Sequence, residues 1–204
     1  MRPKAEATRC GAPAPEPPDS HGNHATRGDS RVEVTLVEIP DPSLVVLVGA
    51  AGAGKSTFAS RHFDPSEILS SDAYRALVSG DEADQSATRS AFAILHRELE
   101  RRLKAGRLTV VDATNVQAHA RHALLRRSRR HGIPAVAIIL DLPESVVLSR
   151  NAARAGRTVA PDVVALQVAA LHATLDDDRL SEEGFASLVF LRTAAEVDAI
   201  RLVR

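Results

Sequence analysis

The sequence has few aromatic residues and a single cysteine. Phe, Trp and Tyr make up 3% of its 204 residues, and Trp is absent, so the core has to be built from Leu, Val, Ile and Ala. Because Cys10 has no second cysteine to pair with, an internal disulfide and a cysteine-rich zinc site are both excluded. These absences favour a cytoplasmic protein.

The sequence also lacks long hydrophobic runs and an excess of charge of one sign. Its strongest apolar runs, Leu44–Val48 and Ala135–Leu140, have the length of strands and fall far short of the roughly 20 residues of a membrane span. The N-terminus has no apolar stretch before a small-residue cleavage site, so we expect neither a secretory signal nor membrane association. Lys plus Arg and Asp plus Glu both total 26, and any basic binding site therefore has to be local.

The composition changes near residue 31. Residues 1–30 are rich in Pro, Gly, Ala, Ser and charge without apolar periodicity, and we expect them to form a disordered tail. The remaining length suits one α/β domain with its own core and is too short for two full-sized ones. We therefore expect residues 31–204 to form a single domain.

From Val32 onward, short β-branched runs alternate with helical patterns, which indicates an α/β fold with a parallel sheet flanked by helices. Strands are expected at Leu44–Val48, Ile68–Ser70, Leu108–Val111, Ala135–Leu140 and Ser187–Leu191. Helices are expected from Lys55 to about His62, Gln117 to Arg130, Pro143 to about Ala153, Pro161 to about Asp177 and Ala194 to Leu202, and around the apolar stripe of Phe92, Leu95, Leu99 and Leu103. Pro143 and Pro161 are each expected at a first helical position, where the missing N–H is tolerated.

A phosphate-binding motif follows the first of these strands. Residues 49–56 read GAAGAGKS and satisfy G-x-x-x-x-G-K-[ST] between an expected strand and an expected helix, the context that a P-loop requires. Glycines let backbone N–H groups approach phosphate oxygens, while Lys55 would reach the β- and γ-phosphates and the Ser56 hydroxyl would ligate Mg²⁺. A ligand-free glycine turn would need neither the Lys-Ser pair nor three glycines. We predict that ATP and Mg²⁺ bind through Gly49, Gly52, Ala53, Gly54, Lys55, Ser56 and Thr57.

A carboxylate follows the expected strand Ile68–Ser70. Asp72 lies at the carboxyl end of that strand, where α/β sheets place their ligands. It could accept the proton of an attacking hydroxyl as a general base. It could equally cap the helix that follows, a common role for Asp.

Asp112 ends the strand Leu108–Val111, and Thr114 and Asn115 follow it. Its place resembles that of a Walker B aspartate, which could hold the magnesium shell through water. Ser56 and Asp112 are therefore the predicted metal residues.

Arginines cluster in two places. Arg150 and Arg154 are four residues apart and are expected to share a helix face, with Arg157 beyond the break that Gly156 suggests. On a lid over the triphosphate, these three side chains would neutralise the transferring phosphoryl group. The run Arg121, Arg126, Arg127, Arg129 and Arg130 is interpreted instead as a solvated helix face.

Four separated blocks occur in the order GAAGAGKSTF, SSDAYRALVSGDEADQ, LTVVDATN and RNAARAGR. Together they resemble the kinase module of bacterial end-healing polynucleotide kinase-phosphatases, over most of the chain from Leu44 onward. The resemblance implies that Asp72 is the base that activates a polynucleotide 5′-OH and that Arg75 holds the acceptor's phosphate. It also places a substrate-binding glutamine at Gln85 and the lid arginines at Arg150, Arg154 and Arg157.

Three features depart from that family. Its enzymes often continue into phosphatase and ligase modules, for which 204 residues leave no room. The Pro-rich tail and Gly80 inside the acidic stretch are also unlike its pattern. The chain could thus be a lone repair kinase, a component acting with separate phosphatase or ligase proteins, or a relative with a changed acceptor.

Three functions are compatible with the motifs. The leading one is ATP-dependent phosphorylation of the 5′-OH end of RNA or DNA. The second is a kinase for a sugar, an antibiotic or a nucleotide-sugar in the manner of zeta-type toxins, and the third is a non-enzymatic ATP-binding regulator. Scarce aromatics count against the first, because single-strand binders usually stack bases on aromatic rings; Tyr74, beside Asp72, is the one tyrosine.

Overall fold

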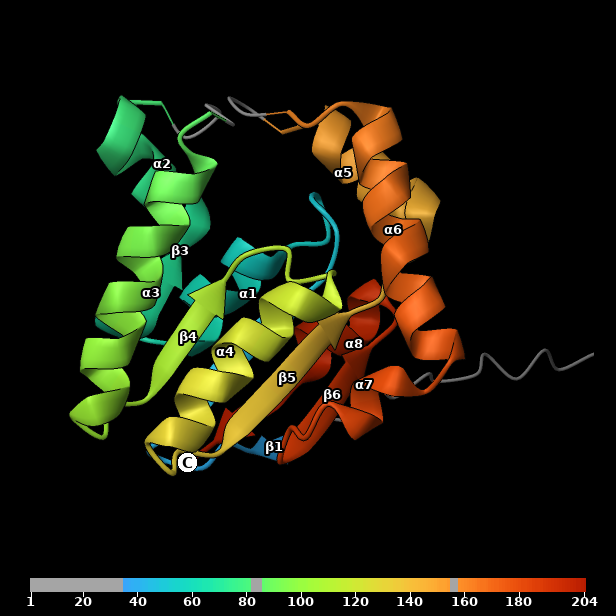
Figure 1. Cartoon of the computed structure of the whole chain (residues 1–204). Helices are drawn as coiled ribbons and strands as arrows, with labels where there is room; N and C mark the ends of the chain where they lie inside the picture. Colours follow the sequence, from blue (N-terminus) through green and yellow to red (C-terminus); the bar gives the residue numbers. More distant parts are fainter. Residues whose placement is uncertain (1–34, 82–85, 155–157) are drawn as a thin grey trace, which may run out of the picture. The chain divides into compact units, whose positions relative to one another are not determined.

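The computed structural model describes residues 35–81, 86–154 and 158–204. A five-stranded parallel sheet has the order β3-β4-β2-β5-β6, and a separate parallel pair joins β1 to β7 (Figure 1). The large sheet consists of β2 (Leu44–Val48), β3 (Ile68–Ser70), β4 (Thr109–Asp112), β5 (Ala135–Leu140) and β6 (Ser187–Leu191), and the pair of β1 (Leu36–Glu38) and β7 (Arg201–Val203). The predicted parallel sheet is confirmed.

The helices lie on both faces of this sheet. They are α1 (Lys55–His62), a 3-10 turn η1 (Pro65–Glu67), α2 (Ser71–Ser79), α3 (Thr88–Lys104), α4 (Ala118–Arg130), α5 (Glu144–Ala152), α6 (Pro161–Asp176), α7 (Arg179–Glu182) and α8 (Ala194–Ala199). None of the helices in the described ranges is long and apolar enough to cross a membrane.

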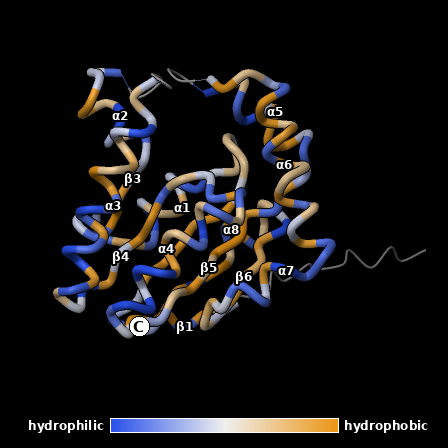
Figure 2. Tube along the Cα trace, viewed as in Figure 1, coloured by the Kyte–Doolittle hydropathy of each residue, from blue (hydrophilic) through white to orange (hydrophobic). Residues whose placement is uncertain are grey.

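The central strands are buried on both sides because their side chains alternate between two apolar clusters. In β2, Val45 and Leu47 join Phe58 of α1 in one cluster, whereas Val46 joins Leu95 of α3 in the other. Figure 2 shows hydrophobic colour along β5 and hydrophilic stretches on the helices around it. A strand covered on both faces has to be apolar throughout, which is why these strands read as continuous hydrophobic runs.

The predicted elements agree closely with the structure, with three corrections. The strand expected at Leu108–Val111 is displaced by one residue, so that it begins at Thr109 and includes Asp112. Pro143 precedes α5 as its N-cap, whereas Pro161 does begin α6 as predicted. The helix expected from Ala194 to Leu202 ends at Ala199, because Arg201–Val203 pairs with Leu36–Glu38. That strand partner is remote in the sequence and gives no local signal.

The strand order brings the ends of three strands together. In the order β3-β4-β2, β4 lies directly beside β2, and Ser70 at the end of β3 pairs with Asp112 at the end of β4. Carboxyl ends of parallel strands meet at one edge of a sheet. The segment after β2, the Asp112 carboxylate and the Asp72 segment therefore lie along one edge.

Candidate active site

The segment between β2 and α1 has the conformation that its glycines permit. Gly52 and Gly54 have φ values of +90° and +96°, which side chains with a Cβ rarely adopt. A Cβ on Gly52 would also lie 2.4 Å from the carbonyl oxygen of Val147 in α5. Gly52 therefore allows both the turn and the close approach of α5.

Lys55 begins α1, and its side chain folds back into this loop. Its Nζ donates to the carbonyl oxygens of Gly49, at 2.9 Å, and Ala50, at 2.8 Å. A buried ammonium group thus lies inside the loop at the N-terminus of a helix. The ammonium charge and the partial positive charge of the helix N-terminus both favour binding of an anion here. Ser56 and Thr57 follow on the first turn of α1 and line the adjoining pocket, while Ala53 is buried in the loop.

Gln167 of α6 contacts this loop and was not anticipated from the sequence. Its Oε1 accepts a hydrogen bond of 2.8 Å from the N–H of Ala51. The contact joins residues 116 positions apart, and no local pattern marks it. It fixes α6 beside the phosphate-binding loop.

Asp112 is a carboxylate whose surroundings suit a magnesium ligand. It is 5% exposed and accepts a hydrogen bond from the Ser56 side chain. Burial raises the pKa of its carboxyl group, against the lowering effects of that hydrogen bond and of the Lys55 charge. A desolvated carboxylate beside a hydroxyl fits Mg²⁺, which prefers oxygen ligands and often uses one or two carboxylates with substrate phosphates.

The described residues contain no group of three or more His, Cys, Asp or Glu side chains that could hold a metal by themselves.

The loop after β4 is pinned to the phosphate-binding loop. The N–H of Gly49 donates to the Thr114 carbonyl at 2.9 Å, and Nδ2 of Asn115 donates to the Leu47 carbonyl at 2.8 Å. Asn115 has a φ of +49°, a conformation that asparagine tolerates better than most residues. These two bonds hold the end of β4, and with it Asp112, against the end of β2.

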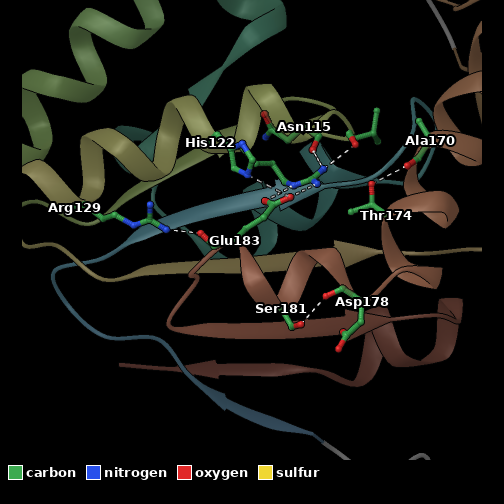
Figure 3. Close-up of polar contacts among 10 residues, drawn as sticks. Asn115, His122, Arg129, Ala170, Thr174, Asp178, Ser181 and Glu183 are labelled. Atoms are coloured by element: carbon green, nitrogen blue, oxygen red, sulfur yellow. Dashed lines mark hydrogen bonds and ion pairs between the residues drawn. The ribbon is translucent and has the colours of Figure 1, made fainter.

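The Arg121 side chain binds the backbone of that loop and is buried. The prediction that Arg121 lies on a solvated helix face is therefore wrong. Its side chain is 0% exposed and donates to the carbonyls of Asn115, at 2.9 Å, and Val116, at 2.7 Å. It also pairs with Glu183, which Figure 3 shows facing α4 between Asn115 and Arg129. The partner is 62 residues away, so the sequence around Arg121 does not reveal its burial. Arg126 and Arg130 of the same run are exposed, as predicted.

Asp72 does not cap α2. The N-cap is Ser70, whose side chain accepts from the N–H of Ala73, and Asp72 lies in the first turn. Its carboxylate forms an ion pair with Arg75, whose side chain is 6% exposed, and lies 4.0 Å from Nη2 of Arg154. The capping alternative is therefore wrong, and Asp72 lies between two guanidinium groups.

Arg150 and Arg154 do not share a helix face, because α5 ends at Ala152. In the last turn of α5, the Asn151 side chain donates to the Val159 carbonyl at 2.7 Å and accepts from the Val159 N–H at 3.1 Å. Arg150 instead lies near the phosphate-binding loop, since a Cβ on Gly54 would be 3.6 Å from its Nη1, and Arg154 lies near Asp72. Gln85 and Arg157 lie outside the described residues.

A cavity of ≈ 890 Å³ connects these groups. Its lining includes Asp72 and Arg75 of α2 and Phe92 of α3, together with Val163 of α6 and Val197 of α8. Lys55, Ser56 and Asp112 lie among the lining residues as well, together with Arg150 and Arg154. The cavity thus brings together every described residue that was predicted to act on phosphate, metal or acceptor, except the buried Ala53 and Gly49.

Solved structures share this fold at low sequence identity. A chain in the Pnkp1/Rnl/Hen1 RNA repair complex matches with a TM-score of 0.58 and 21% identity, over 68% of this chain and 47% of its own length. A chain in the AvrRxo1-ORF1:AvrRxo1-ORF2 complex with sulphate ions matches with a TM-score of 0.59 and 14% identity, over 76% and 55%. A sugar kinase from Janibacter sp. HTCC2649 matches with a TM-score of 0.50 and 21% identity, over 76% and 88%.

The present chain thus spans about half the length of the RNA repair protein that it matches. No curated protein is similar enough in sequence to count as a relative. A family model described as an AAA domain (AAA_33) matches residues 44–177, which is more than half of the chain. The chain therefore belongs to this AAA-domain family, and its fold is that of the P-loop kinases.

Proposed function

We propose that the protein is an ATP- and Mg²⁺-dependent kinase that phosphorylates the 5′-hydroxyl end of a polynucleotide, with Asp72 as the general base. One observation carries the proposal. A single cavity is lined by a phosphate-binding Lys-Ser pair and Asp112 on one side and by an arginine-paired carboxylate, Asp72, on another. A phosphoryl donor and a hydroxyl acceptor need these two kinds of group within reach of each other.

On the donor side, the loop N–H groups and the Lys55 ammonium bind the β- and γ-phosphates of ATP. Ser56 and Asp112 would hold Mg²⁺, which when bound neutralises phosphate charge. The apolar residues Val163 and Val197, which also line the cavity, offer a surface for the nucleoside. Arg150, near Gly54, places a further positive charge at the phosphates.

On the acceptor side, Asp72 takes the proton of the attacking hydroxyl, a contribution of roughly 10²–10⁴ in rate. The guanidinium of Arg75 restrains the carboxylate, and Arg154 lies where it can contact both Asp72 and the phosphoryl group in transfer. The resemblance to polynucleotide kinases adds Gln85 and Arg157 to these residues as predictions.

The polynucleotide acceptor is supported by the four sequence blocks and by the fold shared with a chain of an RNA repair complex. A small hydroxyl compound is the second candidate, and a specific observation favours it. Of the four arginines that line the cavity among the described residues, Arg61, Arg75 and Arg154 each lie within 4.0 Å of a carboxylate, whereas polynucleotide binding depends on cations that neutralise phosphates. The match to the sugar kinase also extends over 88% of that kinase's own length.

The test is a transfer assay with γ-labelled ATP and Mg²⁺, offering 5′-OH oligonucleotides of RNA and DNA beside a panel of sugars, nucleosides and aminoglycosides. The proposal expects label at the oligonucleotide 5′ end and none with Lys55→Ala. Label on a small compound alone would establish the second candidate. Nucleotide binding without transfer to any acceptor would leave a non-enzymatic regulator.

A further inference from the structure

The aromatic residues are few enough to be placed one by one. Phe58 and Phe63 are buried in the core, although Phe58 also borders the cavity. Phe185 and Phe190 pack against the apolar cluster that contains Leu95, and the Arg192 guanidinium lies over the Phe190 ring. Tyr74 follows Asp72 by two residues, yet it packs against the core cluster and is not among the residues that line the cavity. Phe92 is the aromatic side chain that is both half-buried and part of the cavity wall.

We infer that Phe92 determines acceptor specificity by stacking on the terminal nucleobase of the polynucleotide; the inference rests on the proposed function. Phe92 lies on the second turn of α3, which packs along α2, the helix that carries Asp72 and Arg75. All three side chains line the cavity, from two helices that pack against each other. A nucleotide whose 5′-OH reaches Asp72 and whose phosphate reaches Arg75 would therefore have its base on the same side as Phe92.

The ring is held in place before any substrate arrives. Its neighbours Ala91 and Leu95 on α3 are buried in the core, and its ring centroid lies 5.9 Å from that of His96 one turn later. A fixed aromatic side chain loses little conformational freedom on binding. Because every base has a π-face, stacking accepts all four bases, and we expect little preference for the identity of the terminal base.

The inference is tested with 5′-OH oligonucleotides that carry either a normal base or an abasic residue at the 5′ end. Loss of one base–aromatic stack lowers kcat/KM by about 5- to 150-fold. We expect this loss for wild-type protein on the abasic end and for Phe92→Ala on the normal end. Phe92→Ala should lose little more on the abasic end, because both changes remove one contact. The ATP KM should not change.

Two further variants separate stacking from packing. Phe92→Leu keeps an apolar side chain against the core and lacks the ring, so it should reproduce the loss even if Phe92→Ala unfolds. Phe190→Leu removes a comparable ring from β6, outside the cavity, and should retain the full difference between normal and abasic ends.

Two results would overturn the inference while leaving the kinase proposal in place. In one, the abasic end lowers kcat/KM of Phe92→Leu by as large a factor as it lowers that of the wild type. In the other, the wild-type protein phosphorylates normal and abasic ends equally well. A wild-type protein that phosphorylates no oligonucleotide at all would instead reject the polynucleotide acceptor itself, and the stacking inference with it.

Discussion

Arg121 and Glu183 form a two-point ion pair, with distances of 2.8 Å from Nε to Oε2 and 2.5 Å from Nη2 to Oε1 (Figure 3). The remaining Nη1 of Arg121 donates to two carbonyls of the loop after β4, and the Glu183 backbone carbonyl accepts from Arg129. The pair therefore connects the end of α7 to the loop that holds Asp112 against the phosphate site. The Arg121 guanidinium makes these four hydrogen bonds at once. A lysine has three donors on a single nitrogen and could not replace it, so this position requires arginine.

Arg121→Met should lower the free energy of unfolding by about 3–5 kcal/mol, because it leaves the Glu183 carboxylate buried without its partner. The double variant Arg121→Met/Glu183→Met should lose less than the sum of the two single variants, since it leaves no unpaired charge. Urea denaturation measures all three, with Arg126→Met, an exposed arginine of the same helix, as the control. Equal effects of Arg121→Met and Arg126→Met would contradict the structural role given to the pair.

The features that the sequence predicted well are those whose cause is local. Strands covered on both faces need continuous apolar runs, and the glycine pattern before Lys55 is set by the loop itself. Arg121 was misjudged because its carboxylate partner is far away in the chain. Arg150 and Arg154 were wrongly expected to share a helix face, because α5 ends at Ala152 and the helical pattern does not reveal that Asn151 bonds to Val159. The places of Gln167 at the phosphate-binding loop and of Phe92 in the cavity lining depend on where α6 and α3 pack. The sequence around these two residues does not specify that packing.

We expect His96 to make the stability of the protein depend on pH. Burial, with a smaller contribution from Arg127, lowers the pKa of its imidazole from 6.5 to about 4. Between these two values the unfolded chain binds more protons than the folded one, so the free energy of unfolding should fall as the pH decreases from about 6.5 to about 4.

His96→Leu removes the titrating imidazole, so the free energy of unfolding should fall less steeply with decreasing pH in this variant. His119→Gln, an exposed histidine on α4, serves as the matched control and should leave the slope unchanged. Urea denaturation at a series of pH values gives the slopes, and the same slope in His96→Leu and the wild type would refute the assignment.

Arg75 is expected to act on the acceptor's phosphate as well as on Asp72. Arg75→Ala should lower kcat/KM for a 5′-OH oligonucleotide by about 10- to 150-fold, the range for a hydrogen bond to a charged group, with little change in the ATP KM. Removing the phosphate from the substrate, by offering a nucleoside with free 5′- and 3′-hydroxyls, should cost the wild type a similar factor.

The informative quantity is the coupling between these two changes. Any disturbance of Asp72 in Arg75→Ala affects both substrates alike and cancels, so a shared phosphate contact appears as non-additivity. Arg97→Ala, an exposed arginine of α3 outside the cavity, should change neither value. Additive losses, or a wild type that prefers the bare nucleoside, would favour the small-molecule acceptor.

Asp72→Asn tests the central claim most directly. The amide keeps the shape of the side chain and can still accept a hydrogen bond from Arg75, while Ser70 continues to cap α2. ATP binding should therefore be nearly unchanged, and thermal stability should fall only as far as the buried Arg75 guanidinium loses a charged partner. Without the carboxylate to take the acceptor's proton, the rate of label transfer from γ-labelled ATP to a 5′-OH oligonucleotide should fall by about 10²–10⁴. Transfer by Asp72→Asn at the wild-type rate would contradict the role of Asp72 as general base.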